Sequence, residues 1–294
     1  MRPPAHAPVH LTVSSGWQWG FGIFHFAVAI LVIYLFTRGP ARERNWAEVR
    51  FRMLVLIGGG LGAVFFEGAV DRAGNLWYAL PGQWKMIALF GIHVPLWVAP
   101  VYLWFTGGFA LFTILQIRKG AGVATFAKIA GVLVLADIGF EIPIVRFAKL
   151  YVYYGHTQPL FNASWFPLPA WYITTNMFFV LLPALMVMAV MASGQRHIEW
   201  TIPFVMIAAC YMCYGSVTWP VVAALQEGLS KTDTTLAALL TMALGCIATY
   251  VSCRVAPKLR HAMDWYGTSA ITTDPVAASS ATSQAVAPAG AWQP

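Results

Sequence analysis

The sequence predicts an all-α membrane protein, a bundle of about seven transmembrane helices with the N-terminus outside the cell and the C-terminus inside. Its composition, its long apolar runs and the placement of its basic residues support this. The 294 residues are 59% hydrophobic and only 10% charged, with a mean hydropathy of +0.66, whereas soluble domains carry about 25% charged residues. We therefore expect a multi-pass protein of the cell membrane.

The apolar stretches define the expected spans, because crossing a hydrocarbon core of about 30 Å takes roughly 20 helical residues. We place them at 17–37, 50–70, 88–117, 122–146, 169–193, 200–226 and 234–254. Gly107 and Gly108 predict a bend in the long third span, and a count of six spans is the alternative.

The regions outside the spans complete the expected organisation. Residues 1–16 form an extracytoplasmic segment, and residues 17–260 form a single transmembrane domain. Residues 265–294 are rich in Ala, Ser, Thr and Pro, a composition too poor in large apolar residues for a core, which predicts a disordered cytoplasmic tail.

The orientation follows from the rule that Lys and Arg concentrate in cytoplasmic connections. The larger group lies in alternate connections and the tail: Arg38, Arg42, Arg44, Arg50, Arg52, Arg118, Lys119, Lys128, Arg196, Arg254, Lys258 and Arg260. The smaller group lies on the other side: Arg2, Arg72, Lys85, Arg146, Lys149 and Lys231. The first group therefore marks the cytoplasmic side.

Several classes of function are disfavoured. The net charge of +7 is explained by membrane orientation, and no clustered basic face for nucleic acid is visible. No Gly-rich phosphate loop or HExxH motif occurs, so we expect neither a cofactor nor a resident metal. A divalent ion held by the intramembrane carboxylates and a distant His is the alternative.

Four of the 11 acids lie within or at the ends of apolar spans, in two pairs with i,i+4 spacing: Glu67 with Asp71, and Asp137 with Glu141. That spacing places both carboxyl groups of a pair on one helix face. Charged groups in lipid are costly and usually face a bundle interior or a wet cavity. Glu67, Asp137 and Glu141 are the candidate catalytic residues. The alternatives are structural hydrogen bonding for these three and a solvated loop position for Asp71.

Other polar and aromatic residues are predicted at the same depth or in the adjoining outer connections. They are the candidate substrate-binding residues: His93, Asn176, Tyr154, Asp71, Asn75 and Trp219. Trp and Tyr at this level ordinarily form an anchoring belt. Alternatively, they roof an outward-facing pocket that contains the carboxyl groups.

The run LADIGFEIPIVRFAKLYVYYGHTQPL, with Asp137 and Glu141 followed by Tyr151, Tyr153 and Gly155, resembles the spirocyclase AveC-like membrane proteins of actinobacteria. FFEGAVDRAGN also looks like an acid-containing span end of that family, although Glu67-Gly68 stands where Asp-Pro is expected. The resemblance covers about half of the chain. It implies a membrane enzyme that closes rings in, or dehydrates, a lipophilic polyketide-like intermediate. Seven-span membrane terpene cyclases are similar in architecture only.

The residues themselves favour acid–base chemistry. Apolar surroundings favour the protonated form of a carboxyl group, so either Asp137 or Glu141 is expected to act as general acid while its partner accepts a proton. The expected partners are membrane lipids and a lipophilic small-molecule substrate. A non-enzymatic lipid- or sterol-binding protein and a proton-coupled transporter are the rival hypotheses.

Overall fold

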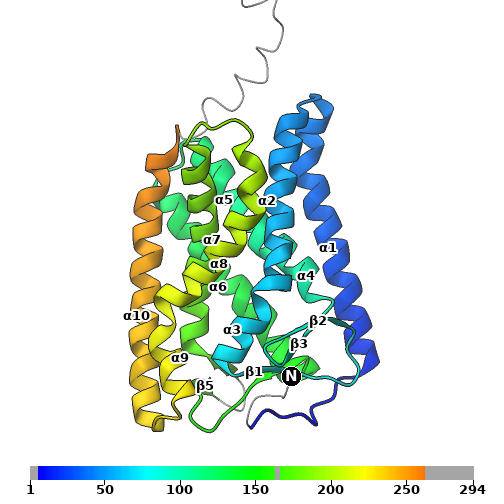
Figure 1. The fold of residues 1–294 in the computed structure, drawn as a ribbon, viewed down its shortest axis with the longest axis vertical. Coiled ribbons are helices and arrows are strands. Elements are labelled where there is room, and N and C mark those ends of the chain that lie inside the picture. Colours follow the sequence, from blue (N-terminus) through cyan, green and yellow to red (C-terminus); the bar gives the residue numbers. More distant parts are fainter. Residues whose placement is uncertain (1–5, 163–165, 262–294) are drawn as a thin grey trace, which may run out of the picture.

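The computed structural model describes residues 6–162 and 166–261 as an elongated bundle of helices (Figure 1). The predicted tail at 265–294 lies outside the described residues. The long helices are α1 (Ser15–Arg42), α2 (Trp46–Phe65), α5 (Gly108–Arg118), α6 (Val123–Ile142), α7 (Ala170–Met191), α8 (Ile202–Val217) and α10 (Lys231–Val255). Shorter helical segments are α3 (Glu67–Gly74), α4 (Val98–Tyr102), η1 (Leu103–Gly107), η2 (Pro143–Ala148), η3 (Ile198–Thr201), α9 (Trp219–Gln226) and η4 (Ala256–Leu259).

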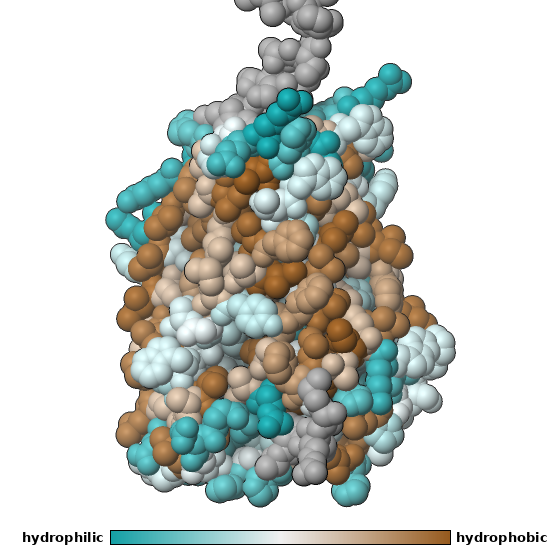
Figure 2. All heavy atoms as spheres, viewed as in Figure 1, coloured by the Kyte–Doolittle hydropathy of each residue, from teal (hydrophilic) through white to brown (hydrophobic). Residues whose placement is uncertain are grey.

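The apolar character of the bundle agrees with a membrane protein. Within the described residues, six helices are long and apolar enough to cross a membrane, or up to seven if α2 and α3, which meet at 49°, form one span. Large apolar side chains such as Ile30, Leu135 and Phe204 are more than half exposed on the outside of the bundle. Figure 2 shows hydrophobic residues over the middle of one face and hydrophilic residues toward both ends.

Two of the predicted spans differ from the structure. Residues 88–97 do not begin a helix, because β2 (Lys85–Leu89) and β3 (Ile92–Pro95) form an antiparallel hairpin there. Its two turn residues, Phe90 and Gly91, have φ of 52° and 83°, which is typical of a tight hairpin turn. The stretch 200–226 is divided at Thr218 into α8 and α9, where Pro220 has no amide hydrogen to continue the helix.

Three ion pairs gather at one end of the bundle. Arg50 bonds Glu199 at 2.8 Å, and Glu48 accepts from Arg52 and from Arg118 at 2.7 Å each. These contacts join the start of α2 to the end of α5 and to η3. The connections that carry these Arg residues therefore meet at the same end of the bundle, as expected if alternate connections lie on the same side. The assignment of that end to the cytoplasm remains a prediction.

The opposite end carries the strands (Figure 1). β1 (Leu76–Tyr78) pairs antiparallel with β4 (Tyr151–Tyr153), and β5 (Leu160–Asn162) pairs with β6 (Phe166–Pro169). Asn75, at φ 54°, ends α3, and Lys149, at φ 51°, ends η2. Because a left-handed residue stops a helix, the chain leaves both helices there and enters the paired strands β1 and β4.

Two glycines set the distance between α2 and η1. A Cβ atom on Gly59 would lie 2.4 Å from the backbone nitrogen of Gly107, and a Cβ on Gly107 would lie 2.8 Å from the carbonyl oxygen of Leu56. Small residues allow such close helix packing in membrane proteins. At Gly107 the structure has the π-helical segment η1 within a continuous helix from Val98 to Arg118, and the predicted bend stays a prediction.

Candidate active site

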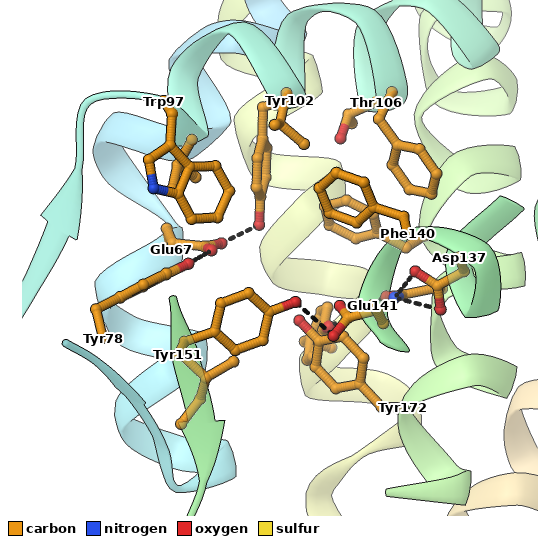
Figure 3. A pocket seen from close by; sticks show the side chains of 17 residues that line it. Glu67, Tyr78, Trp97, Tyr102, Thr106, Asp137, Phe140, Glu141, Tyr151 and Tyr172 are labelled. Carbon is orange, nitrogen blue, oxygen red and sulfur yellow. Dashed lines mark hydrogen bonds between the residues drawn. The ribbon is translucent and has the colours of Figure 1, made fainter. Parts of the chain in front are cut away.

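A buried cavity of about 60 Å³ contains the three predicted catalytic carboxyl groups. Glu67 enters it from α3, whereas Asp137 and Glu141 enter it from α6 (Figure 3). All three side chains are buried. A water molecule needs roughly 10–15 Å³ of such space, so the cavity has room for a few waters or for the polar end of a ligand.

Two phenol groups hold Glu67. The hydroxyl of Tyr78 on β1 donates to Oε1 at 2.5 Å, and the hydroxyl of Tyr102 on α4 donates to Oε2 (Figure 3). Burial, followed by the nearby Asp71 and Glu67, raises the pKa of Tyr78 well above its usual value. The Tyr78 hydroxyl therefore keeps its proton and acts as a donor at neutral pH.

Glu141 has an equivalent arrangement on the facing side. The hydroxyl of Tyr151 on β4 donates to Oε2, and the Tyr153 hydroxyl lies 3.5 Å from the same oxygen. Tyr78 and Tyr151 are directly opposite in the β1–β4 pair, with ring centroids 5.4 Å apart. Since opposite residues of an antiparallel pair share a face, this small sheet directs one phenol to each carboxyl group.

Asp137 is bound by an amide. Nδ2 of Asn176 on α7 donates to both of its carboxyl oxygens, at 3.0 and 3.1 Å. The Tyr214 hydroxyl on α8 donates in turn to Oδ1 of Asn176 at 3.2 Å. The network thus fixes the orientation of the Asn176 amide and joins three helices.

The partners of these carboxyl groups are neutral. Among the described residues, the ion pairs found involve Glu48 and Glu199, at the other end of the bundle. Taking an ionised carboxylate out of water without a cation is costly. Neutral phenol and amide donors, and no ion pair among the described residues, therefore hold these three carboxyl groups.

The helical segments beside the cavity are irregular. The π-helical η1 carries Thr106, whose fully buried hydroxyl lines the cavity and has no hydrogen-bond partner among the described residues. A second π-helical segment, η2, starts at Pro143, directly after the helix that carries Glu141. Such π segments occur frequently at functional sites.

The remaining residues predicted by sequence occupy several places. Asn176 lines the cavity, whereas Asp71 lies one turn after Glu67, is 2% exposed and is not in the lining. Both Asp71 carboxyl oxygens have no hydrogen-bond partner among the described residues. The alternative of a solvated loop acid at Asp71 is therefore wrong, because α3 continues through this position and buries it.

Four other predicted residues lie outside the cavity. His93 is in β3, opposite Ala88, because the hairpin replaces the expected helix start. Asn75 and Tyr154 border a separate polar groove, and Trp219, 58% exposed, borders an apolar groove. The structure thus brings together Glu67, Asp137, Glu141 and Asn176, but not the whole predicted set.

Several lining residues were not predicted as candidates, among them Tyr78 and Tyr151, which donate to Glu67 and Glu141. Tyr102 holds Glu67, and Tyr172 lies on the cavity wall. Aromatic residues in an apolar span are equally compatible with core packing, so their position in the sequence carries no signal for this role.

With the described residues, the same carboxyl groups do not form a metal site. Among residues 6–162 and 166–261, no group of three or more His, Cys, Asp or Glu side chains is arranged to hold a metal ion. The described residues therefore offer no ligand cluster for a divalent ion at these carboxylates.

Comparison of the chain with known family models, curated proteins and solved structures gives no match. Assignment of a function therefore depends on the residues and on the geometry of the cavity.

Proposed function

We propose that this protein is a membrane-embedded cyclase or dehydratase that uses buried carboxyl groups for acid-catalysed ring closure in a lipophilic substrate. The observation that carries the proposal is the convergence of Glu67, Asp137 and Glu141 on one cavity with neutral hydrogen-bond partners. The resemblance to the spirocyclase AveC-like proteins points to the same chemistry.

The proposed reaction needs only proton transfers. One protonated carboxyl group, Glu141 or Asp137, donates its proton to a hydroxyl group of the substrate, whose carbon–oxygen bond breaks as water leaves. A hydroxyl of the same substrate attacks the resulting cation and forms the ring carbon–oxygen bond. The other carboxylate takes the hydroxyl proton, so the products are the cyclic compound and one water.

The cavity wall supports such an intermediate. Trp97, Phe140 and Tyr151 line the cavity, and aromatic faces attract a developing positive charge. Glu67, held by two phenols, would supply a nearby negative charge or a further proton. Since ligand sites of drug-sized molecules occupy about 300–1,000 Å³, the observed cavity accommodates only the reacting end of the substrate.

Single substitutions test the proposal. Asp137→Asn and Glu141→Gln each preserve shape but remove the titratable group, so each is expected to lower turnover by about 100-fold or more, the usual contribution of a general acid or base. Glu43→Gln is the control, because Glu43 is an exposed acid in the α1–α2 connection. Wild-type turnover in both Asp137→Asn and Glu141→Gln would contradict the proposal.

Non-enzymatic lipid binding is the second candidate. The apolar groove beside α3 and α9 favours it, because it provides a lipid-sized surface outside the acid cavity. Lipid that is recovered chemically unchanged after incubation with active preparations would support binding over catalysis.

A further inference from the structure

Helices α3 and α9 lie side by side near the end that carries the strands (Figure 1). Gln226 at the end of α9 joins them. Its Nε2 lies 3.3 Å and 3.1 Å from the carbonyl oxygens of Arg72 and Ala73, and 3.3 Å from Oδ1 of Asn75. We call the surface along these two helices the α3–α9 seam, comprising residues 66–75 and 215–228.

One part of the seam is apolar. A groove of about 230 Å³ runs between Phe66, Ala69 and Ala73 on one side and Gly215, Trp219 and Val222 on the other. Trp219 is 58% exposed at its edge. The groove lies beside the breaks between α2 and α3 and between α8 and α9.

The next part of the seam is polar. A groove of about 650 Å³ is bordered by Arg72, Asn75, Tyr154 and His156, with the acid Glu227 also on its rim. No ion pair within the described residues involves Arg72. The Tyr154 side chain is 9% exposed, and its hydroxyl has no hydrogen-bond partner among those residues. A cation, Arg72, and Tyr154, whose buried hydroxyl has no hydrogen-bond partner among these residues, therefore border one cleft.

The two grooves are bordered by the same two helices. Ala73 borders the apolar groove and Arg72 the polar one on α3, while Val222 and Gln226 do the same on α9. We propose that the α3–α9 seam binds an anionic membrane lipid, with its hydrocarbon chain between Ala69 and Trp219 and its phosphate or carboxylate headgroup at Arg72 and Tyr154. The apolar groove alone would fit any alkyl chain, whereas Arg72 and the Tyr154 hydroxyl select an anionic head.

The seam also adjoins the acid cavity. Tyr214 lines both the apolar groove and the cavity, and its hydroxyl bonds Asn176, the partner of Asp137. Tyr214 thus belongs to the wall of both the groove and the cavity, and it is linked to Asp137 through Asn176. Binding of a lipid in the seam does not depend on the proposed function. The further statement that this lipid is the substrate, or shows how the substrate enters, does rest on the proposed function.

Photo-crosslinking tests the site. The protein in phosphatidylcholine vesicles is labelled with phosphatidic acid that carries a diazirine in its acyl chain, and labelled peptides are identified by mass spectrometry. Labelling is expected to concentrate in residues 66–73 and 215–222. Diacylglycerol with the same chain is expected to label this region less, because it lacks the charged head. Labelling spread evenly over the outer helices, or equal labelling by the two lipids, would overturn the proposal.

Matched variants sharpen the result. Gly215→Leu places a side chain in the groove, where a Cβ atom meets nothing within 4 Å, and is expected to lower labelling about tenfold because it displaces a few methylene groups of the lipid. Gly131→Leu is the control: Gly131 is exposed on α6, also with nothing within 4 Å. Arg72→Gln is expected to lower labelling by phosphatidic acid about fivefold, the effect of one basic residue on anionic lipid binding, and to leave diacylglycerol unaffected. Unchanged labelling in both Gly215→Leu and Arg72→Gln refutes the site.

Failure of this proposal is distinguishable from failure of the proposed function. Glu141→Gln, which is expected to stop turnover, leaves the seam intact and is expected to be labelled like the wild type. Normal labelling without any turnover in the wild type would support the seam and refute the enzyme, whereas turnover without localised labelling would do the reverse.

Discussion

Tyr78 and Tyr151 show how individual side chains organise the cavity. They face each other across two short strands, and the hydroxyl of each donates a hydrogen bond to a different buried carboxyl group. Burial and the neighbouring Glu141 raise the pKa of Tyr151 well above its usual value. The two phenols therefore keep their protons and remain hydrogen-bond donors at physiological pH.

Replacement of Tyr151 tests that network. Tyr151→Phe removes the donor to Glu141 and is expected to destabilise the folded protein by about 1–3 kcal/mol, the cost of leaving a buried acceptor unsatisfied. Tyr153→Phe is the matched control on the same strand, because its hydroxyl lies at the 3.5 Å limit from the same oxygen. Thermal unfolding in detergent measures both; equal melting temperatures for the two variants would contradict the assigned roles.

The acids could be predicted from sequence because an intramembrane carboxyl group needs an explanation. That argument identified Glu67, Asp137 and Glu141, which share one cavity. For Asp71 the sequence left a solvated loop position open, because Arg72 beside it is as typical of an exposed loop as of a helix end. Tyr102 and Tyr172 could not be predicted, since only the folded arrangement distinguishes a cavity tyrosine from a packed one.

At the scale of elements, hydrophobicity predicted the helices better than their ends. The stretch 88–97 is apolar, but it forms a hairpin whose turn at Phe90 and Gly91 no helical periodicity can reveal. Short apolar runs are ambiguous between strand and buried helix. The pairing of β1 with β4 joins segments more than 70 residues apart, and local sequence patterns carry no information about it.

The close contact between α2 and η1 yields a prediction about elements. Gly59→Ala introduces a Cβ atom 2.4 Å from the Gly107 nitrogen, so the two segments must separate, at an expected cost of about 1–3 kcal/mol. Gly131→Ala serves as the control, because its Cβ atom meets nothing within 4 Å and alanine favours helix. Thermal unfolding is the measurement. A melting temperature for Gly59→Ala at or above that of Gly131→Ala would contradict the packing.

At the scale of the whole molecule, the distribution of basic residues predicts which end faces the cytoplasm. The structure places the α1–α2 connection and the strands at opposite ends of the bundle (Figure 1). The acid cavity adjoins the strand end, because Tyr78 and Tyr151 line it. With the predicted orientation, the chemistry would take place in the outer half of the membrane.

Cysteine labelling tests this orientation. In a variant with its four native cysteines replaced, Arg44→Cys and His156→Cys each introduce one thiol at an exposed position. A membrane-impermeant maleimide added to intact cells is expected to label His156→Cys, and Arg44→Cys only after lysis. The reverse pattern would contradict the orientation, and labelling of both in intact cells would contradict their placement at opposite ends.

The central claim is that the buried carboxyl groups transform a lipophilic ligand. The most direct test of this conversion is mass spectrometry of the lipids that are bound to the purified protein. The bound lipids are compared before and after the protein is incubated in membrane vesicles with a lipid extract of the host. With the wild type, a bound species is expected to be converted to an isomer or to a product lighter by one water, whereas Glu141→Gln is expected to bind the same species without converting it. Identical spectra before and after incubation with the wild type, or equal conversion by Glu141→Gln, would contradict the claim.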